Sequence, residues 1–299
     1  MYLPGFLSLA AVASILSTAS ACDSCNGNLH RREAEGGGEG GEPGFSYLGL
    51  TGPVNWNQFS QACGSGKTQS PINVVSTMQT SSYGDNGEYA DIGATGFNFT
   101  NTGHTVEVFY RGQSALLGGV EYELQRFHFH TPSEHRLDNE WFPMEVHFVH
   151  QGKNDPSKLA VVGIFIDTRD DNVSDPMMSR LATLLQSIEK PGETVIATHV
   201  PLQGVRTAIT SAKKFTYPGS LTTPPCSEGV TWYVSNTILG VSVSDYKAFK
   251  SVLGYNSRNL QADPGKQNVV EFAAQFLPAV QNRVQAKKER RARATKWTA

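Results

Sequence analysis

The sequence predicts a mainly β protein with surface helices (α+β), organised as a single domain around a large, twisted, mostly antiparallel central sheet. Three observations predict this fold. Runs of alternating apolar and polar residues, rich in β-branched and aromatic side chains, recur along the middle of the chain, whereas runs with helical spacing are few. No internal repeat is found, and 299 residues are enough to bury one large core.

The strand signals lie at residues 105–110, 127–130, 146–150, 159–167 and 230–234. Helix signals lie in three places. Ser174 could cap a helix whose apolar residues recur at helical spacing until Pro191-Gly192 ends it. Ser244-Asp245 could cap a second, which runs through Leu253, and a third is expected over residues 268–284.

A His-x-His pattern, Phe127-His128-Phe129-His130, lies in one predicted strand, and His147 lies in the next. Because side chains alternate along a strand, His128 and His130 share one face, and antiparallel pairing would bring His147 to the same face. Three neutral imidazoles leave the fourth position of a tetrahedral Zn²⁺ open to water, as in catalytic zinc sites. A single His-x-His is also typical of core histidines, so this pattern alone leaves both interpretations open.

Several further motifs occur in the same order as in one known family. They are residues 70–73 (SPIN), 101–104 (NTGH), 125–135 (QRFHFHTPSEH), 144–150 (MEVHFVH), 217–226 (YPGSLTTPPC) and 230–232 (VTW). Together they resemble the α-class carbonic anhydrases, over about residues 47–261. The resemblance implies a cone-shaped cleft with zinc at its bottom, and reversible hydration of carbon dioxide to bicarbonate and a proton by zinc-bound hydroxide.

The resemblance also assigns catalytic roles. Thr222 would orient the nucleophile, because the ionised Glu134 can only accept a proton from its hydroxyl and leaves the threonine oxygen free to accept another. His104 matches the family's proton shuttle, and its ordinary pKa of about 6.5 suits a group that takes and returns a proton at neutral pH. Without the family match, these would be a turn residue, a buried ion-pair partner and an exposed loop histidine.

Two positions would support the histidines from behind. Glu145 is two residues before His147 and on its face, so it could accept the free N–H of that ring. Arg126 departs from the family, which usually has Gln there as acceptor for the first zinc histidine, since arginine has no acceptor atom. Gln125 is adjacent but is expected to face away. A water, a carbonyl or another side chain should take over, or His128 should be held more loosely.

An apolar wall beside the nucleophile suits CO₂, which is uncharged and hydrogen-bonds poorly. By resemblance, the substrate pocket would comprise Val149, Val161, Leu221, Thr223, Val230, Trp232 and Tyr47. Most of these would otherwise be ordinary core residues. Phe45 stands where the family often has Trp, which bears on the water network at the N-terminal side of the cleft.

The first residues resemble a secretory leader. Residues 6–16 are apolar but too short to span a bilayer, and Ala19-Ser20-Ala21 follows as a small-x-small cleavage pattern. We therefore expect a signal peptide (1–21), a Gly/Glu-rich flexible segment (22–43), the carbonic anhydrase domain (44–265) and a C-terminal helix with a basic tail (266–299). The protein would be secreted and extracellular.

The four cysteines agree with export. By resemblance, Cys63 and Cys226 would form a disulfide that ties an N-terminal loop to the 222–225 loop. Cys22 and Cys25 could form a local disulfide, an intermolecular one or a redox motif. Asn98 and Asn172 each begin an Asn-x-Ser/Thr sequence and are candidate glycosylation sites.

The charge is unevenly distributed. From Arg283 onward the chain has seven basic residues and one acidic residue, so this tail carries +6 and the rest −8 of a formal net charge of −2. Attraction to nucleic acid or a membrane surface is one interpretation of the tail. A solvated helix end is favoured, because no aromatic residues are interleaved with the charges. We expect no nucleic-acid partner and no membrane span, and the oligomeric state is left open.

Two other functions can be weighed. The family contains binding modules without catalysis, but these typically lack one or more of the zinc histidines, and all three are present here. A zinc hydrolase of the His-Glu-x-x-His type is disfavoured because that motif is absent from the sequence.

Overall fold

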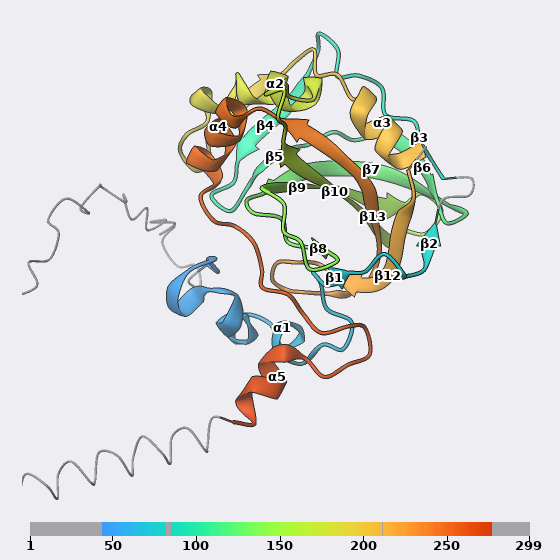
Figure 1. Ribbon diagram of the computed structural model, residues 1–299, viewed down its shortest axis with the longest axis vertical. Helices are drawn as coiled ribbons and strands as arrows, with labels where there is room; N and C mark the ends of the chain where they lie inside the picture. Colours follow the sequence, from blue (N-terminus) through green and yellow to red (C-terminus); the bar gives the residue numbers. More distant parts are fainter. Residues whose placement is uncertain (1–43, 82–84, 211, 277–299) are drawn as a thin grey trace, which may run out of the picture. The chain divides into compact units, whose positions relative to one another are not determined.

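One large sheet dominates the structure, a computed structural model that describes residues 44–81, 85–210 and 212–276 (Figure 1). Its main path runs β11-β4-β5-β7-β9-β10-β13-β12-β2, and β6 extends it by pairing with β7 and β3. The only parallel pair in this described sheet is β10 with β13. The predicted fold class is confirmed.

The strands of this sheet are β2 (Thr80–Ser81), β3 (Asn86–Gly87), β4 (Phe97–Asn101), β5 (Val106–Val108), β6 (Gln113–Leu117), β7 (Val120–His130), β9 (Met144–Gly152), β10 (Leu159–Thr168), β11 (Thr194–Ala197), β12 (Lys214–Ser220) and β13 (Glu228–Val241). A separate parallel pair joins β1 (Asn73–Val74) to β8 (Arg136–Leu137). All five predicted strands lie within or across β5, β7, β9, β10 and β13.

The helices are short. They are α1 (Gln61–Ser65), α2 (Pro176–Ala182), α3 (Gln203–Thr210), α4 (Val243–Leu253) and α5 (Val269–Ala274), with 3-10 turns η2 (Gly49–Thr51), η3 (Pro53–Gln58) and η4 (Leu185–Ser187). Side chains of α2, α3 and α4 pack into the main core on one face of the sheet. A second apolar cluster lies on the opposite face and includes Val161 and Trp232.

Two of the predicted helix caps are wrong by one or two positions. The carboxylate of Asp175, not Ser174, accepts from the backbone N–H of Met177 at the start of α2. Ser174 instead donates its hydroxyl to Asp245. Ser242, not Ser244 or Asp245, caps α4 by accepting from the Asp245 N–H. In each case a better-placed oxygen lies within two residues of the expected one.

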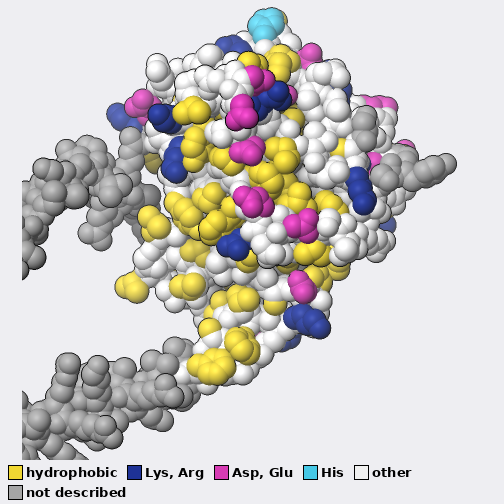
Figure 2. Space-filling model, viewed as in Figure 1, with side chains coloured by type: hydrophobic (Ala, Val, Ile, Leu, Met, Phe, Trp, Pro, Cys, Tyr) yellow, Lys and Arg dark blue, Asp and Glu magenta, His cyan; other side chains and the backbone are white. Residues whose placement is uncertain are grey.

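The third predicted helix begins as expected. Asn268 accepts from the Val270 N–H and caps α5. The expected continuation to residue 284 and the basic tail lie outside the described residues, as do the leader, the 22–43 segment, Cys22 and Cys25. Apolar side chains reach the surface at α5 (Figure 2), and Phe272 in this helix and Phe276 just after it are each 53% exposed. Of the helices described, none is both long and apolar enough to cross a membrane.

Candidate active site

The three predicted zinc histidines meet on one face of the sheet. His128 and His130 lie at the end of β7, and the antiparallel register sets His128 directly opposite His147 on β9. One nitrogen from each of the three rings lies within 4.8 Å of the others. Phe127 and Phe129, which alternate with the histidines, are fully buried in the main core on the other face. The alternation of apolar and polar residues therefore fixes which side chains face the site.

Hydrogen bonds define which nitrogen of two rings is free. Nδ1 of His130 is 2.8 Å from the carbonyl oxygen of Asn256, which can only accept, so Nδ1 carries the proton and Nε2 keeps its lone pair. That Nε2 is buried and has no hydrogen-bond partner. Nε2 of His147 is 2.9 Å from Glu145 Oε1, so this ring donates from Nε2 and presents Nδ1. These free lone pairs suit a metal that takes nitrogen ligands.

All three imidazoles favour the neutral form that a metal requires. Burial lowers the pKa of His130 to about 4. Burial also lowers the pKa of His147, although the Glu145 carboxylate opposes this shift. The pKa of His128 is well below its ordinary value, through burial first and then through repulsion from His130, His147 and Arg126. The site therefore presents three neutral imidazoles at neutral pH, the form in which histidine binds a metal.

Glu145 organises the region behind His147. Its Oε1 is also 2.7 Å from Nδ1 of His135. Its Oε2 accepts the backbone N–H groups of Glu134 and His135, at 2.8 and 2.9 Å. Burial would raise the pKa of Glu145, but charges and hydrogen bonds from His135 and His147 hold it well below its ordinary value. The carboxylate is therefore ionised and can hold the His147 ring in one orientation.

His135, Glu145 and His147 also meet the distance requirement for a metal-binding group. In this second cluster the atoms already satisfy one another through hydrogen bonds, and His135 Nε2 is 2.6 Å from the Tyr217 hydroxyl. We therefore regard it as the support of the first cluster. The contact of His135 with Glu145 is not evident from the sequence, because it depends on a turn that no motif predicts.

Glu134 is fully buried close to the histidines. One of its oxygens accepts the backbone N–H of Arg258 at 2.8 Å. Burial raises its pKa to about 7, while the nearby His147 ring, the Thr222 hydroxyl and the Arg258 N–H act to lower it. Glu134 Oε2 is buried and has no hydrogen-bond partner among the described residues. Thr222 is itself only 6% exposed. The two residues therefore lie close together.

His104 lies beside an aromatic side chain from the N-terminal segment. Its ring stacks on Phe45 with centroids 4.1 Å apart and an interplanar angle of 13°. Its backbone carbonyl accepts from the amide of Asn256, the residue that also holds His130. Partial burial lowers the pKa of His104 below 6.5. Asn256 therefore links the loop of His104 to His130, a candidate metal ligand, and the sequence does not predict this connection.

Five residues predicted to form the apolar wall belong to one cluster next to His147. Val149, Val161, Val230 and Trp232 are buried in it, and Leu221 packs against it. The Trp232 ring contacts His147 edge-on, with centroids 4.8 Å apart. Tyr47 lies instead with Trp56 in a different cluster that contains the disulfide. The Glu134 charge helps to raise the pKa of Tyr47, after burial, so this phenol still lies near that carboxylate.

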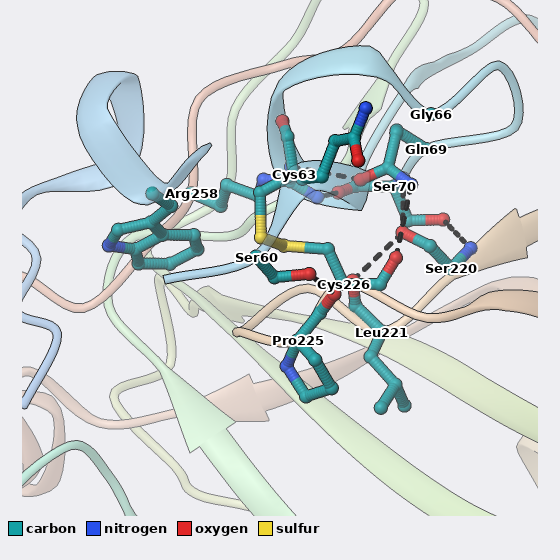
Figure 3. The surroundings of a disulfide bond; sticks show 12 residues. Ser60, Cys63, Gly66, Gln69, Ser70, Ser220, Leu221, Pro225, Cys226 and Arg258 are labelled. Atoms are coloured by element: carbon teal, nitrogen blue, oxygen red, sulfur yellow. Dashed lines mark hydrogen bonds between the residues drawn. A yellow bond between two sulfur atoms is a disulfide. The ribbon is translucent and has the colours of Figure 1, made fainter. Parts of the chain in front are cut away.

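The predicted disulfide between Cys63 and Cys226 is present (Figure 3). It joins α1 to the loop that carries Thr222 and Thr223. Ser60 donates to the carbonyl of Pro225 at 2.8 Å, and Gln69 donates to the carbonyl of Cys226 at 3.1 Å. The guanidinium of Arg258 donates to the carbonyls of Ser70 and Cys63 (Figure 3). The disulfide and the hydrogen bonds to the carbonyls of Pro225 and Cys226 therefore hold the 222–225 loop in place.

Arg126 lies on the same face as His128 and bonds to neither ring nitrogen. Its Nε is 3.3 Å from Glu107 Oε2. Nδ1 of His128 is buried without a hydrogen-bond partner. The expectation that Gln125 faces away assumed strict alternation of side chains along β7. A register shift between Leu124 and Arg126 interrupts that alternation. The Gln125 amide donates to the backbone carbonyl of Glu123, at 3.3 Å.

Comparison with known proteins agrees with this geometry. The sequence profile of the family described as eukaryotic-type carbonic anhydrase matches residues 51–272. A carbonic anhydrase of Pectobacterium carotovorum is 32% identical over 267 residues, covering 88% of this chain and 98% of its own length. Human carbonic anhydrase 7 is 32% identical over 238 residues, 71% of this chain and 87% of its own.

Solved structures give the same result. The α-carbonic anhydrase of the fungus Aspergillus oryzae is 35% identical and superposes with a TM-score of 0.73, covering 79% of this chain and all of its own length. The α-carbonic anhydrase of Thermovibrio ammonificans, solved with the inhibitor sulfanilamide, is 29% identical with a TM-score of 0.67, covering 76% of this chain and 99% of its own. The chain therefore belongs to the α-class, eukaryotic-type carbonic anhydrase family, the enzymes that hydrate carbon dioxide reversibly.

Proposed function

We propose that the chain hydrates CO₂ with one zinc ion held by His128, His130 and His147, with Thr222 and Glu134 orienting the nucleophile and His104 moving the proton. The convergence of three neutral imidazoles on one point, with His130 and His147 buried and His128 half-buried, carries this proposal. Nitrogen ligands and a missing fourth protein ligand fit Zn²⁺ in a catalytic site. When bound, zinc lowers the pKa of a water in its fourth position to about 7, which provides hydroxide at neutral pH.

Thr222 and Glu134 set the direction of attack. An ionised Glu134 can only accept, so the Thr222 hydroxyl must donate to it, and the threonine oxygen is then left as an acceptor for the nucleophile's proton. This fixes where the lone pair of the nucleophile points. Burial raises the pKa of Glu134, and a bound zinc cation would act in the opposite direction and favour the ionised, accepting form. The backbone N–H of Arg258 holds the carboxylate in place.

His104 would export the proton. An acid of pKa about 7 cannot release protons directly to water faster than about 10³ per second, because its return rate is already limited by diffusion. A neutral imidazole near the cleft removes this limit. The pKa of His104 is lowered by burial, so the ring stays neutral, and thus able to accept, to a lower pH than a free histidine. Phe45 holds the ring by stacking.

The apolar cluster beside His147 would bind the substrate. Val149, Val161 and Trp232 present hydrocarbon surface, which suits uncharged CO₂ and excludes water. Thr223 and Tyr47 are proposed to complete the pocket. Bicarbonate, the charged product, has no favourable partner on this wall and is expected to leave towards water.

We further propose that the protein is secreted. The Cys63–Cys226 disulfide supports this, since disulfides persist in oxidising compartments. Asn98, whose side chain is exposed on β4, is the better glycosylation candidate. The Oδ1 of Asn172 already accepts the backbone N–H of Val243 at 2.9 Å.

Stopped-flow CO₂ hydration tests the proposal directly. The purified protein should accelerate hydration well above buffer, lose this activity after a chelator removes zinc, and regain it with stoichiometric zinc. His128→Ala, His130→Ala and His147→Ala should each prevent zinc retention. Metal-replete protein that gives no acceleration would refute the catalytic proposal and leave a binding module of the same fold.

A further inference from the structure

The ring of His128 lacks the kind of acceptor that orients the other two histidines. His130 and His147 each donate their second N–H to a fixed acceptor, Asn256 or Glu145. His128 has no such partner, because its Nδ1 is buried without a hydrogen bond. A histidine that binds a metal normally donates its other N–H to an acceptor that fixes the ring. Something near Nδ1 must therefore accept this proton once zinc is bound.

Arg126 cannot do so. A guanidinium only donates, and its Nε is directed to Glu107 at 3.3 Å. Glu107 lies on β5, and the antiparallel register sets it directly opposite His128. Residues opposite one another have Cβ atoms about 4.5–5.5 Å apart and point to the same face. The neighbouring pair, Val108 and Phe127, is buried in the main core on the other face. The Glu107 carboxylate is thus on the side of the metal site.

We propose that Glu107 is the acceptor for the Nδ1–H of His128, and that Arg126 holds its carboxylate in reach by ion pairing. Glu107 and Arg126 are then positioning residues, and this inference rests on the proposed zinc site. The backbone register sets Glu107 opposite His128, and we propose that rotation of the Glu107 side chain about its own bonds brings its carboxylate to Nδ1. Its side chain is only 13% exposed, so water competes weakly for the carboxylate. His128 then binds the metal through Nε2, the same nitrogen that His130 presents.

The pair explains how the chain tolerates arginine at position 126. One carboxylate oxygen can accept from the guanidinium while the other accepts from the imidazole. The negative charge of Glu107 also offsets the repulsion that Arg126 exerts on a nearby metal cation. The support of His128 thus comes from a neighbouring strand, whereas an amide at position 126 would supply it from the same strand.

The test measures zinc affinity in competition with a chromogenic chelator. Glu107→Ala should weaken zinc binding 10- to 100-fold, the usual cost of losing the group behind a metal histidine. Glu107→Gln, which keeps an acceptor oxygen, should lose less. Arg126→Met removes the ion pair without adding an acceptor and should weaken binding, whereas Arg126→Gln adds one and should not.

A combined variant separates this role from general damage. Arg126→Gln in the Glu107→Ala background should restore most of the affinity, because the new amide can accept from Nδ1. Glu123→Ala, which removes a half-buried carboxylate from the same strand, is the matched control and should leave zinc affinity unchanged. The unfolding midpoints of the metal-free proteins show whether each variant is folded.

The outcomes are distinct. If the unmodified protein binds zinc tightly but Glu107→Ala binds it equally well, Glu107 is not the acceptor. If Gln125→Leu weakens binding instead, the acceptor is the bulge residue Gln125 and the proposal is wrong. If the unmodified protein binds no zinc, the proposed function fails before this inference is reached. In the zinc-loaded protein, the ¹⁵N-attached Nδ1 proton of His128 should resonate as a strongly hydrogen-bonded imidazole and shift in Glu107→Ala.

Discussion

At the scale of single residues, the site depends on where each proton is held. Asn256 and Glu145 accept from His130 and His147, so each ring keeps one lone pair free on the side of the site. Glu134 differs, because burial raises its pKa to about 7 and it still needs a donor for its second oxygen. Thr222 is the nearby donor, which is why its hydroxyl, more than its bulk, should matter.

Removing that hydroxyl should slow catalysis without removing the metal. Thr222→Val should lower kcat by about 10²-fold, the typical cost of losing the orientation of a reacting group. Thr222→Ser keeps the hydroxyl and should retain most of the rate. Stopped-flow CO₂ hydration at pH 8 measures both variants, with bound zinc determined in parallel. Equal rates for Val and Ser would show that the hydroxyl has no orienting role.

The proton shuttle should show a distinctive pH dependence. His104 accepts a proton only as a neutral imidazole, and its pKa is lowered by burial. The shuttle-limited rate should therefore rise to half its maximum below pH 6.5. Phe45→Ala exposes the ring and should move this midpoint upward, towards 6.5. The measurement is kcat for CO₂ hydration as a function of pH, at a buffer concentration too low for the buffer to carry the proton.

His104→Ala is the control for that experiment. It should abolish the fast proton-transfer phase, and added imidazole should restore it. A rate that His104→Ala leaves unchanged would remove this residue from the pathway, whatever Phe45→Ala does.

The sequence pointed to the residues proposed to carry the chemistry more directly than to those that support them. His128, His130 and His147 follow from alternation within strands, and Thr222 and Glu134 from the motif resemblance. Asn256 could not be predicted, because it reaches the site from a loop far along the chain. The sequence does not predict the role proposed for Glu107, for a related reason. Its relation to His128 exists only through the β5–β7 register, which sequence spacing does not determine.

At the scale of elements, β7, β9 and β10 position the site. β9 and β10 are buried along almost their whole length, so their apolar runs identify them as central strands. The strands that the sequence does not predict, such as β4 and β12, contain Asn, Lys, Pro and Gly, which disfavour strands locally. Pairing with long neighbours stabilises them instead. A helix as short as α1, whose only fully buried residue is Cys63, carries too few apolar residues to show a clear period.

Gly163 shows how closely β10 approaches the site. A Cβ atom at this position would lie 2.8 Å from Glu145 Oε1 and 3.7 Å from Cδ2 of His147. The Glu145 carboxylate cannot move aside freely, because four hydrogen bonds fix it. A side chain at Gly163 would therefore disturb the orientation of His147 as well as the packing.

Gly163→Ala should destabilise the protein by about 1–3 kcal/mol, the usual cost of overpacking, and weaken zinc binding about tenfold or more. Gly93→Ala is the matched control. No atom of the described residues lies within 4 Å of the position that its methyl group would take, so stability should stay unchanged or rise by up to about 1 kcal/mol. Urea unfolding and chelator competition measure both variants. A Gly163→Ala protein as stable and as zinc-retentive as the control would contradict the proposed role of this close contact.

At the scale of the whole described domain, the Cys63–Cys226 bond closes most of the sheet into one covalent loop. The two cysteines are separated by 163 positions, and every strand of the sheet except β13 begins and ends between them. In the chain-entropy view, closing so long a loop removes many conformations from the unfolded state. The bond also lies next to the loop that carries Thr222, so it couples global stability to local geometry.

Replacing both cysteines with alanine should lower the free energy of unfolding by about 2–5 kcal/mol. The native contacts around the bond are hydrogen bonds to backbone carbonyls, which the variant retains, so it should still fold at low temperature. The CO₂ hydration rate should fall more than zinc affinity, because the bond supports the Thr222 loop and not the histidines. The control is the Cys22→Ala, Cys25→Ala protein, which should unfold like the unmodified protein. A Cys63→Ala, Cys226→Ala protein within about 0.5 kcal/mol of the unmodified one would show that the 222–225 loop and α1 are held together by their polar contacts alone.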